Sequence, residues 1–340
     1  MSATTTASRA EAPVTGGGRR TKPGPHGLTW ALLRLHGWAA VCWAVLVLVT
    51  AGALLWAAGP GVDAAWADYH TETCRDDGQV SVNCDFAAPA LDRYDAVVGF
   101  SSSLITGMPL LVALWAGAAL IGRELENGTA QLTWTQSVTP ARWLAAKLAL
   151  PAAVLGAGTL LLVLAHRLMW SAHIEQGGGA WHWQGYEEEL FVGNGPLAVA
   201  RVLLGLVVGA LIGLLTRRSM ASLGYGFFAL VGLIRLLDLV RPYLWPAETV
   251  TNPANEGTPH RVGLVADSGV VTADGTHVAT GWCSSSDCGR TDVVGHYLDY
   301  HPTSHFWPLH LVETGIVLAV TALLVLAAFR LLRRRTGGAV

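Results

Sequence analysis

The stretch GRELENGTAQLTWTQSVTPARWLAAK, residues 122–147, is the polar segment around which the rest of the chain is organised. It separates two long apolar runs, and past Glu126 it contains no acidic residue. The pair Asn127-Gly128 is typical of a turn or a helix end. The pair Thr139-Pro140 is typical of a helix start, because the hydroxyl can cap the first turn and proline lacks an N–H that would have no partner there. The stretch therefore predicts a short helix, a turn and a second helix start.

Some side chains along this stretch recur at a spacing close to that of an α-helix, which places them on one side of it. They are Leu125, Thr129, Leu132 and Gln136. A loop that only connects two membrane helices does not need side chains aligned on one side of a helix. We therefore interpret the segment as a docking surface for another protein.

The composition is that of a membrane protein. Of the 340 residues, 52% are hydrophobic and 14% are charged, whereas soluble domains have about 25% charged residues. The mean hydropathy is +0.41. A run of about 20 apolar residues can cross the hydrocarbon core of a bilayer. Such runs predict an all-α membrane protein with six transmembrane helices, near residues 37–58, 96–121, 143–164, 196–215, 220–240 and 309–331.

The remaining segments have other compositions. Residues 1–27 are rich in Ser, Thr, Ala, Gly and Pro and cannot bury a core, so we expect a disordered tail. Residues 28–335 are the predicted six-helix transmembrane domain, and residues 336–340 are a second short tail. The longer connections are expected to be loops on one side of the membrane, at residues 59–95, 166–194 and 241–308.

Basic residues predict the orientation. The residues before the first span, the 122–147 stretch, the Arg217-Arg218 turn and the C-terminal end from Arg330 hold 14 of the 22 basic residues. The same regions hold only 3 of the 24 acidic residues. Because short connections rich in Lys and Arg face the cytoplasm, we expect cytoplasmic N- and C-termini and three longer loops outside the cell.

The sequence resembles a known family in the central stretch. The order Glu124-x-Glu126-x-Gly128-Thr129, then Gln136-Ser137-Val138-Thr139-Pro140-x-Arg142, then Lys147, is similar to the cytoplasmic coupling segment of ABC-2-type transporter permeases. In that family this segment joins the second and third membrane helices and touches the ATP-binding subunit. The layout of the family fits the chain from about residue 37 to residue 335.

This resemblance implies a permease subunit of an ABC exporter. A second permease subunit, identical or related, would complete the translocation path, and two copies of a separate ATPase would bind ATP and Mg²⁺. The contacts with the ATPase implied by the resemblance are apolar at Leu125, Thr129 and Leu132 and polar at Glu124, Glu126 and Arg142, with Gly128 in the turn between them.

The chain contains none of three common catalytic or nucleotide-binding motifs, namely GxxxxGK[ST], GxSxG and HExxH. We therefore expect no enzyme activity, no cofactor in this chain and no nucleic-acid partner, and we expect a lipid bilayer around the spans. Lysine occurs only twice while Ala, Gly and Arg abound, which suggests GC-rich coding and a bacterial cell membrane. The spans show no recognisable substrate pocket.

Four charged residues lie toward the outer ends of predicted spans, namely Arg201, Arg235, Asp238 and Glu313. Charges within a membrane are costly and usually face the bundle interior or a water-filled path. Two interpretations remain open: side chains that snorkel to the interface, or a polar belt at an outer gate. Arg235 and Asp238 are three residues apart and can pair on one helix.

Four of the five cysteines lie in the predicted outside loops, where disulfides can persist. The simplest pairings are Cys74–Cys84 and Cys283–Cys288. Free or cross-loop cysteines are the alternative, because spacing alone does not fix connectivity. Cys42 lies in the first span and is expected to be a packing residue.

The outside histidines raise an alternative function. His301 and His305 are four residues apart and could bind a metal on a helix, but Pro302 and Pro308 argue against a long helix there. We therefore expect surface histidines and no metal site. A membrane protein for redox or haem chemistry is the first alternative, and a non-transporting scaffold or immunity protein is the second.

A series of small residues in the fourth span, Gly205, Gly209 and Gly213, would let helices approach closely. Its spacing suits dimerisation or packing within the chain, and the sequence does not separate these two uses.

Overall fold

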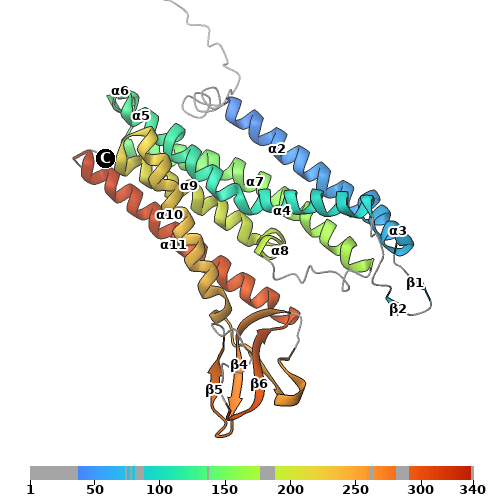
Figure 1. Ribbon diagram of the computed structural model, residues 1–340. Helices are drawn as coiled ribbons and strands as arrows, with labels where there is room; N and C mark the ends of the chain where they lie inside the picture. The colour runs from blue at the N-terminus through green and yellow to red at the C-terminus, as the bar shows by residue number, and fades with distance from the viewer. Residues whose placement is uncertain are drawn as a thin grey trace, which may run out of the picture.

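The computed structural model describes residues 37–72, 75–76, 79–80, 88–135, 138–176, 188–259, 263–280 and 291–337. Within these residues six helices are long and apolar enough to cross a membrane, which confirms the six predicted spans, and the fold is mostly helical, although the prediction was all-α. They form one slanted bundle, and a small sheet projects from one end of it (Figure 1). The cysteines predicted to form disulfides lie outside the described residues, at Cys74, Cys84, Cys283 and Cys288.

Each span is one helix or a run of consecutive helical segments. The first comprises α2 (Gly37–Trp56), the π-helical η1 (Ala57–Gly61) and α3 (Val62–Glu72), and the second comprises α4 (Pro89–Trp115), the π-helical η2 (Ala116–Gly122) and α5 (Arg123–Glu126). The others are α7 (Pro140–Glu175), α9 (Pro196–Thr216), α10 (Ser219–Val240) with η4 (Arg241–Tyr243), and η6 (Thr303–His305) with α11 (Phe306–Arg335). Two short helices connect spans, α6 (Thr129–Thr135) and α8 (Glu188–Gly193).

Several helices are longer than predicted. α7 has 36 residues, which at about 1.5 Å per residue gives about 54 Å, well beyond a hydrocarbon core of about 30 Å. Residues 166–175 therefore continue this helix, although they were predicted as loop. Residues 59–72 and 89–95 are likewise helical. The prediction ended each span where polar residues appear, but polar side chains do not end a helix that has left the membrane.

The connection predicted as one long loop, residues 241–308, contains a four-stranded antiparallel sheet in the order β3–β6–β4–β5. A tight turn joins β4 to β5 at Asp274 and Gly275, where Gly275 has a φ of 81°. Asp-Gly between β-branched runs is a hairpin signal that the prediction missed. The strands are β3 (Glu248–Pro253), β4 (Leu264–Thr272), β5 (His277–Ala279) and β6 (Val293–His301), and a separate two-stranded pair is β1 (Arg75–Asp76) with β2 (Gln79–Val80).

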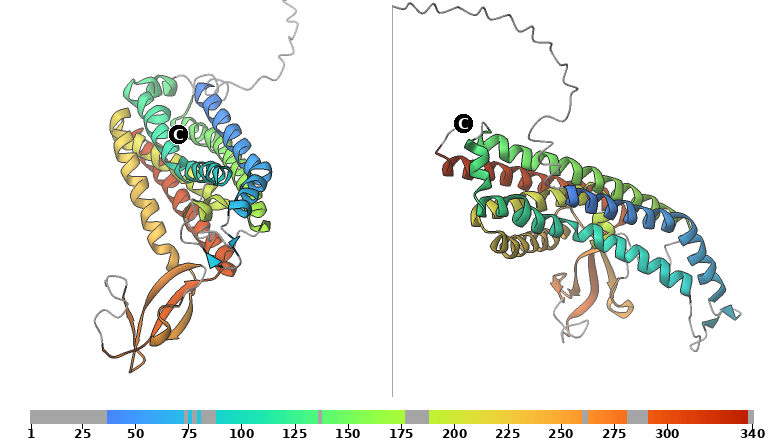
Figure 2. Two further views of the ribbon diagram at one scale, coloured as in Figure 1. Left: turned by 45° about the vertical axis from the view of Figure 1, so that its right-hand side comes forward. Right: turned by 90° about the horizontal axis from the view of Figure 1, so that it is seen from above.

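α9 occupies the middle of the bundle. It packs against α4, α7, α10, α11 and η2, and most of its residues are buried, whereas most residues of α2, α10 and α11 are not. Figure 2 shows α5 and α6 at one end of the bundle and the sheet at the other. We refer to these as the α5–α6 end and the sheet end. Arg335 donates a hydrogen bond to the Leu214 carbonyl, so the C-terminus also lies at the α5–α6 end.

The glycine series on α9 serves packing within the chain. A Cβ at Gly205 would lie 2.3 Å from the carbonyl oxygen of Pro109, and one at Gly209 would lie 2.2 Å from that of Ala113. Both carbonyls belong to α4, so the two helices meet backbone to backbone. This contact holds α9 in the centre.

We expect Gly209→Ala to destabilise the folded protein by about 1–3 kcal/mol, because the added methyl overpacks the contact with α4. Gly224→Ala on α10 is the matched control, since a Cβ there would meet nothing within 4 Å. Thermal unfolding in detergent measures both. Equal transition midpoints for the two variants would contradict the role given to the α9–α4 contact.

We expect the α5–α6 end to be cytoplasmic. In a cysteine-depleted background, a membrane-impermeant maleimide applied to intact cells should label Thr276→Cys in the β4–β5 turn but not Gln131→Cys on α6. Both positions are exposed, so both should react after permeabilisation. Labelling of Gln131→Cys on intact cells would reverse the orientation.

Candidate functional site

The polar stretch between the second and third spans folds as the sequence predicted. α5 continues the second span, Gly128 turns the chain at a φ of 72°, and α6 follows. Glycine suits that turn because it adopts a positive φ without strain. Thr139 then caps α7, accepting a hydrogen bond from the Arg142 backbone N–H at 3.3 Å. We call residues 123–142 the α5–α6 segment; residues 136 and 137 lie outside the described part of the chain.

Glu124 anchors the α5–α6 segment to α7. Its carboxylate accepts hydrogen bonds from Lys147 Nζ at 2.5 Å and from Trp143 Nε1 at 3.2 Å. Lys147 is buried, and a buried ammonium requires a close carboxylate to offset its lost hydration. The prediction gave Glu124 a role in contacting another protein, whereas the structure gives its side chain partners within the chain.

Glu126 anchors the same segment to α10. Its carboxylate accepts hydrogen bonds from the backbone N–H of Ser219 at 2.9 Å and from the Ser219 hydroxyl at 2.6 Å. Ser219 is the first residue of α10, so the carboxylate lies at the positive end of that helix. The segment is therefore tied to two spans besides the one that it extends.

Several residues of the α5–α6 segment are exposed, and we call them its exposed face. Leu132, in the middle of α6, is 61% exposed and is the exposed large apolar side chain in the described part of this segment. Leu125 is half-buried and packs against the core instead. The other exposed residues of the predicted set are Glu126, Gly128, Thr129 and Arg142.

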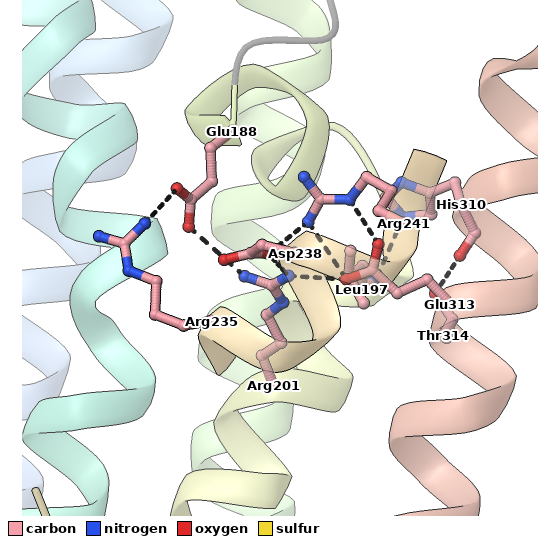
Figure 3. Close-up of polar contacts among 9 residues, drawn as sticks. All are labelled: Glu188, Leu197, Arg201, Arg235, Asp238, Arg241, His310, Glu313 and Thr314. Atoms are coloured by element: carbon pink, nitrogen blue, oxygen red, sulfur yellow. Dashed lines mark hydrogen bonds and ion pairs between the residues drawn. The ribbon is translucent and has the colours of Figure 1, made fainter. Parts of the chain in front are cut away.

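At the sheet end, buried charges from three spans form one network (Figure 3). Arg201 of α9 donates to Asp238 of α10 and to Glu313 of α11, both at 2.6 Å. Arg241 of η4 donates to Glu313 at 2.6 Å and to Asp238 at 2.7 Å. Two cations and two anions thus balance in the interior, as buried charges require. We call these four residues the charge cluster.

The charge cluster contains three of the four predicted residues. Arg201 and Glu313 are fully buried, so snorkelling does not describe them. The spacing of Arg235 and Asp238 allows them to pair, but in the structure Asp238 binds Arg201 and Arg241, while the Arg235 side chain is 69% exposed and lies 3.7 Å from Glu188. Arg241 is absent from the predicted set because it was assigned to the loop at residues 241–308.

Glu188 of α8 borders the charge cluster, 3.8 Å from Arg201. Burial and the neighbouring Asp238 carboxylate raise the pKa of Glu188 above its ordinary value. On the other side, the Arg241 guanidinium lies over the ring of Phe191, 4.6 Å from its centroid. α8 thus covers the cluster with one carboxylate and one aromatic ring.

His166 and His310 are buried and bonded to neighbouring helices. His166 lies 2.9 Å from both Ser102 Oγ and Asn194 Oδ1 through its two ring nitrogens. His310 Nε2 accepts a hydrogen bond from the Leu197 backbone N–H at 3.1 Å. The observed contacts assign both rings to helix packing.

A cavity of about 370 Å³ lies between α2, α4, η2 and α7, which the sequence analysis did not anticipate. Among the described residues that line it, Lys147 is the one charged side chain. Cys42, predicted as a packing residue, is exposed and lines this cavity. The rest of the lining includes Trp43, Leu46, Met108, Trp115, Pro151 and Leu155.

We expect Glu313→Ala to cost about 3–5 kcal/mol of stability, because it leaves Arg201 and Arg241 as uncompensated buried charges. Arg235→Ala should change stability by less than about 0.5 kcal/mol, since its side chain is exposed. Denaturation followed by tryptophan fluorescence in detergent compares the two. A Glu313→Ala variant as stable as Arg235→Ala would contradict the network.

Comparison with known proteins agrees with this architecture. A family model described as ABC-2 membrane transporter related matches residues 44–241, more than half of the chain. The match includes the whole α5–α6 segment and three members of the charge cluster, Arg201, Asp238 and Arg241. No curated protein and no solved structure matches the chain. With six apolar spans and this match, the chain belongs to the ABC-2 membrane transporter related family, and it is a multi-pass membrane protein of the permease type.

Proposed function

We propose that the chain is the permease subunit of an ATP-driven exporter in a bacterial cell membrane. Two permease subunits, identical or related, enclose the translocation path, and two copies of a separate ATPase dock on the cytoplasmic α5–α6 segments. ATP and Mg²⁺ bind to that ATPase. The family match supports a transporter. The α5–α6 segment supports a second kind of subunit, which hydrolyses ATP while this chain forms the transport path.

The anchoring of the α5–α6 segment is the observation that carries this proposal. Its exposed face presents Leu132 to a partner, while Glu124 binds Lys147 of α7 and Glu126 binds Ser219 of α10. A force applied to the exposed face therefore reaches three spans at once. A loop that only connected two helices would need neither anchor.

α10 links the two ends of the bundle. It has 22 residues, which gives about 33 Å of helix, and it carries Ser219 at one end and Asp238 near the other. Most of its residues are not buried, so neighbouring helices restrain it less than they restrain α9. When the ATPase pair closes, the α5–α6 segment pulls on Ser219, and α10 transmits the movement to the charge cluster.

The charge cluster acts as the outer gate in this proposal. Arg201 stays on the central helix α9, while Asp238 and Arg241 move with α10 and η4. Separating Asp238 from Arg201 exposes charges that hydrate readily, so an opening at the sheet end can fill with water. The ion pairs then re-form and close the path after release.

The apolar cavity supports a substrate with an apolar portion. Its lining joins α2, α4 and α7 and ends at Lys147, the partner of Glu124. A hydrophobic group entering between these helices would therefore contact the residue that anchors the α5–α6 segment. Export is the proposed direction, as in most transporters of this type.

Leu132→Glu should weaken docking of the ATPase, because it places a carboxylate where an exposed apolar side chain would be buried. Met220→Glu is the control: Met220 is 77% exposed at the same end of the bundle, outside the α5–α6 segment, and an acid is favourable in the first turn of α10. Co-purification with the ATPase encoded nearby and its hydrolysis rate in nanodiscs are the measurements. We expect at least a tenfold loss of association for Leu132→Glu alone.

The proposal fails if Leu132→Glu retains both association and stimulated hydrolysis at the level of Met220→Glu. In that case the α5–α6 segment does not contact the ATPase. Thermal unfolding of each variant in detergent shows that a loss of docking is not a loss of folding.

A further inference from the structure

Two imidazole rings face each other where the sheet meets the last span. His301 ends β6, and His305 precedes the first residue of α11. Their Nδ1 atoms lie 3.3 Å apart. His301 is fully buried, whereas the side chain of His305 is 19% exposed, so one side of the pair faces the surface.

The opposite nitrogens of both rings point at acceptors. His301 Nε2 lies 2.8 Å from the carbonyl oxygen of Pro242, which can only accept, so this nitrogen carries the proton. His305 Nε2 lies 3.7 Å from the Glu248 carboxylate, which favours a proton there as well. A neutral ring that carries its proton on Nε2 has no proton on Nδ1, so Nδ1 has a free lone pair. Two lone pairs facing each other at this distance repel unless a cation lies between them.

The arrangement matches a pair of metal ligands. Histidine nitrogens bind Zn²⁺ at about 2.0–2.1 Å, and two of them at a tetrahedral angle lie about 3.3–3.4 Å apart. Histidines that bind metals almost always donate the other ring N–H to a backbone carbonyl or a carboxylate. Here the Pro242 carbonyl accepts from His301, while the Glu248 carboxylate lies near His305 Nε2 at 3.7 Å, beyond hydrogen-bond length. The His301 ring is thus oriented as a ligand before any ion arrives.

We propose that His301 and His305 bind a divalent transition-metal ion of the Zn²⁺ type through their Nδ1 atoms. No group of three or more His, Cys, Asp or Glu side chains gathers around a metal position in the described part of the chain. The ion therefore has two protein ligands among these residues and takes water or small anions at its other positions. Affinity is accordingly lower than in a four-ligand structural site.

The location gives the ion a structural consequence. Pro242 follows Arg241, which holds Glu313 and Asp238 in the charge cluster. His305 lies directly before α11, and Glu248 belongs to β3. A bound ion thus joins the sheet to the end of the fifth span, at η4, and to the start of α11, two of the three spans that carry the charge cluster. This inference stands whether or not the chain is an exporter.

Titration of the EDTA-treated, full-length protein in detergent with Co²⁺ tests the site. We expect one equivalent to give the visible ligand-field bands of tetrahedral coordination by two nitrogens and two other ligands, and Zn²⁺ to abolish them. His305→Gln should weaken binding at least tenfold. His277→Gln, at an exposed histidine of β5 in the same sheet, should leave it unchanged.

His305→Gln is the deciding variant because His301 is fully buried and its replacement could unfold the sheet. Unchanged Co²⁺ affinity in His305→Gln would overturn the proposal by placing the ion elsewhere. Absence of the bands in the wild-type protein would overturn it too, and would leave a proton as the cation between the two rings.

Discussion

A charge within a bilayer has no water to hydrate it, so it must find its counter-charge inside the protein. This chain meets the constraint at two places. At the α5–α6 end, Glu124 and Lys147 form one buried pair. At the sheet end, Arg201, Arg241, Asp238 and Glu313 form a balanced network. Each of the second to sixth spans contributes at least one residue to these two sites.

The charges also decide which helices can move. α9 is held by backbone contacts with α4 at Gly205 and Gly209, and such contacts have little room to adjust. α10 has polar contacts near its two ends, of Ser219 with Glu126 and of Asp238 with Arg201. Ion pairs and hydrogen bonds can break and re-form, whereas the glycine contact cannot do so without separating α9 from α4. The bundle therefore combines a fixed central helix with a peripheral helix that connects its two ends.

The six spans and the helix–turn–helix of the α5–α6 segment could be predicted because each depends on local sequence: apolar length, the Asn127-Gly128 turn and the Thr139 cap. The charge cluster could be predicted only in part. Its members come from α9, α10, η4 and α11, and only tertiary packing decides that Arg241 enters while Arg235 stays outside. The inward use of Glu124 and Glu126 was missed for the same reason, since their partners Lys147 and Ser219 lie far along the chain.

The sheet was not predicted for a different reason. Its hairpin at Asp274-Gly275 carried a local signal, but the Gly, Pro, Thr and Asp content of residues 241–308 suggested a loop. The cavity beside Lys147 had no local signal, because its lining comes from α2, α4, η2 and α7. Such sites form where distant segments of the chain meet. The spacing of apolar residues in the sequence does not reveal which segments meet.

The central claim is that the α5–α6 segment receives force from a nucleotide-binding partner. A photo-crosslinking amino acid at position 132, activated in native membranes and followed by mass spectrometry, tests it most directly. The account predicts a crosslink to a separate protein that contains a GxxxxGK[ST] nucleotide-binding loop. The same probe at position 220 should give no such crosslink. Crosslinks from position 132 only to lipid, or only to a second copy of this chain, would contradict the account.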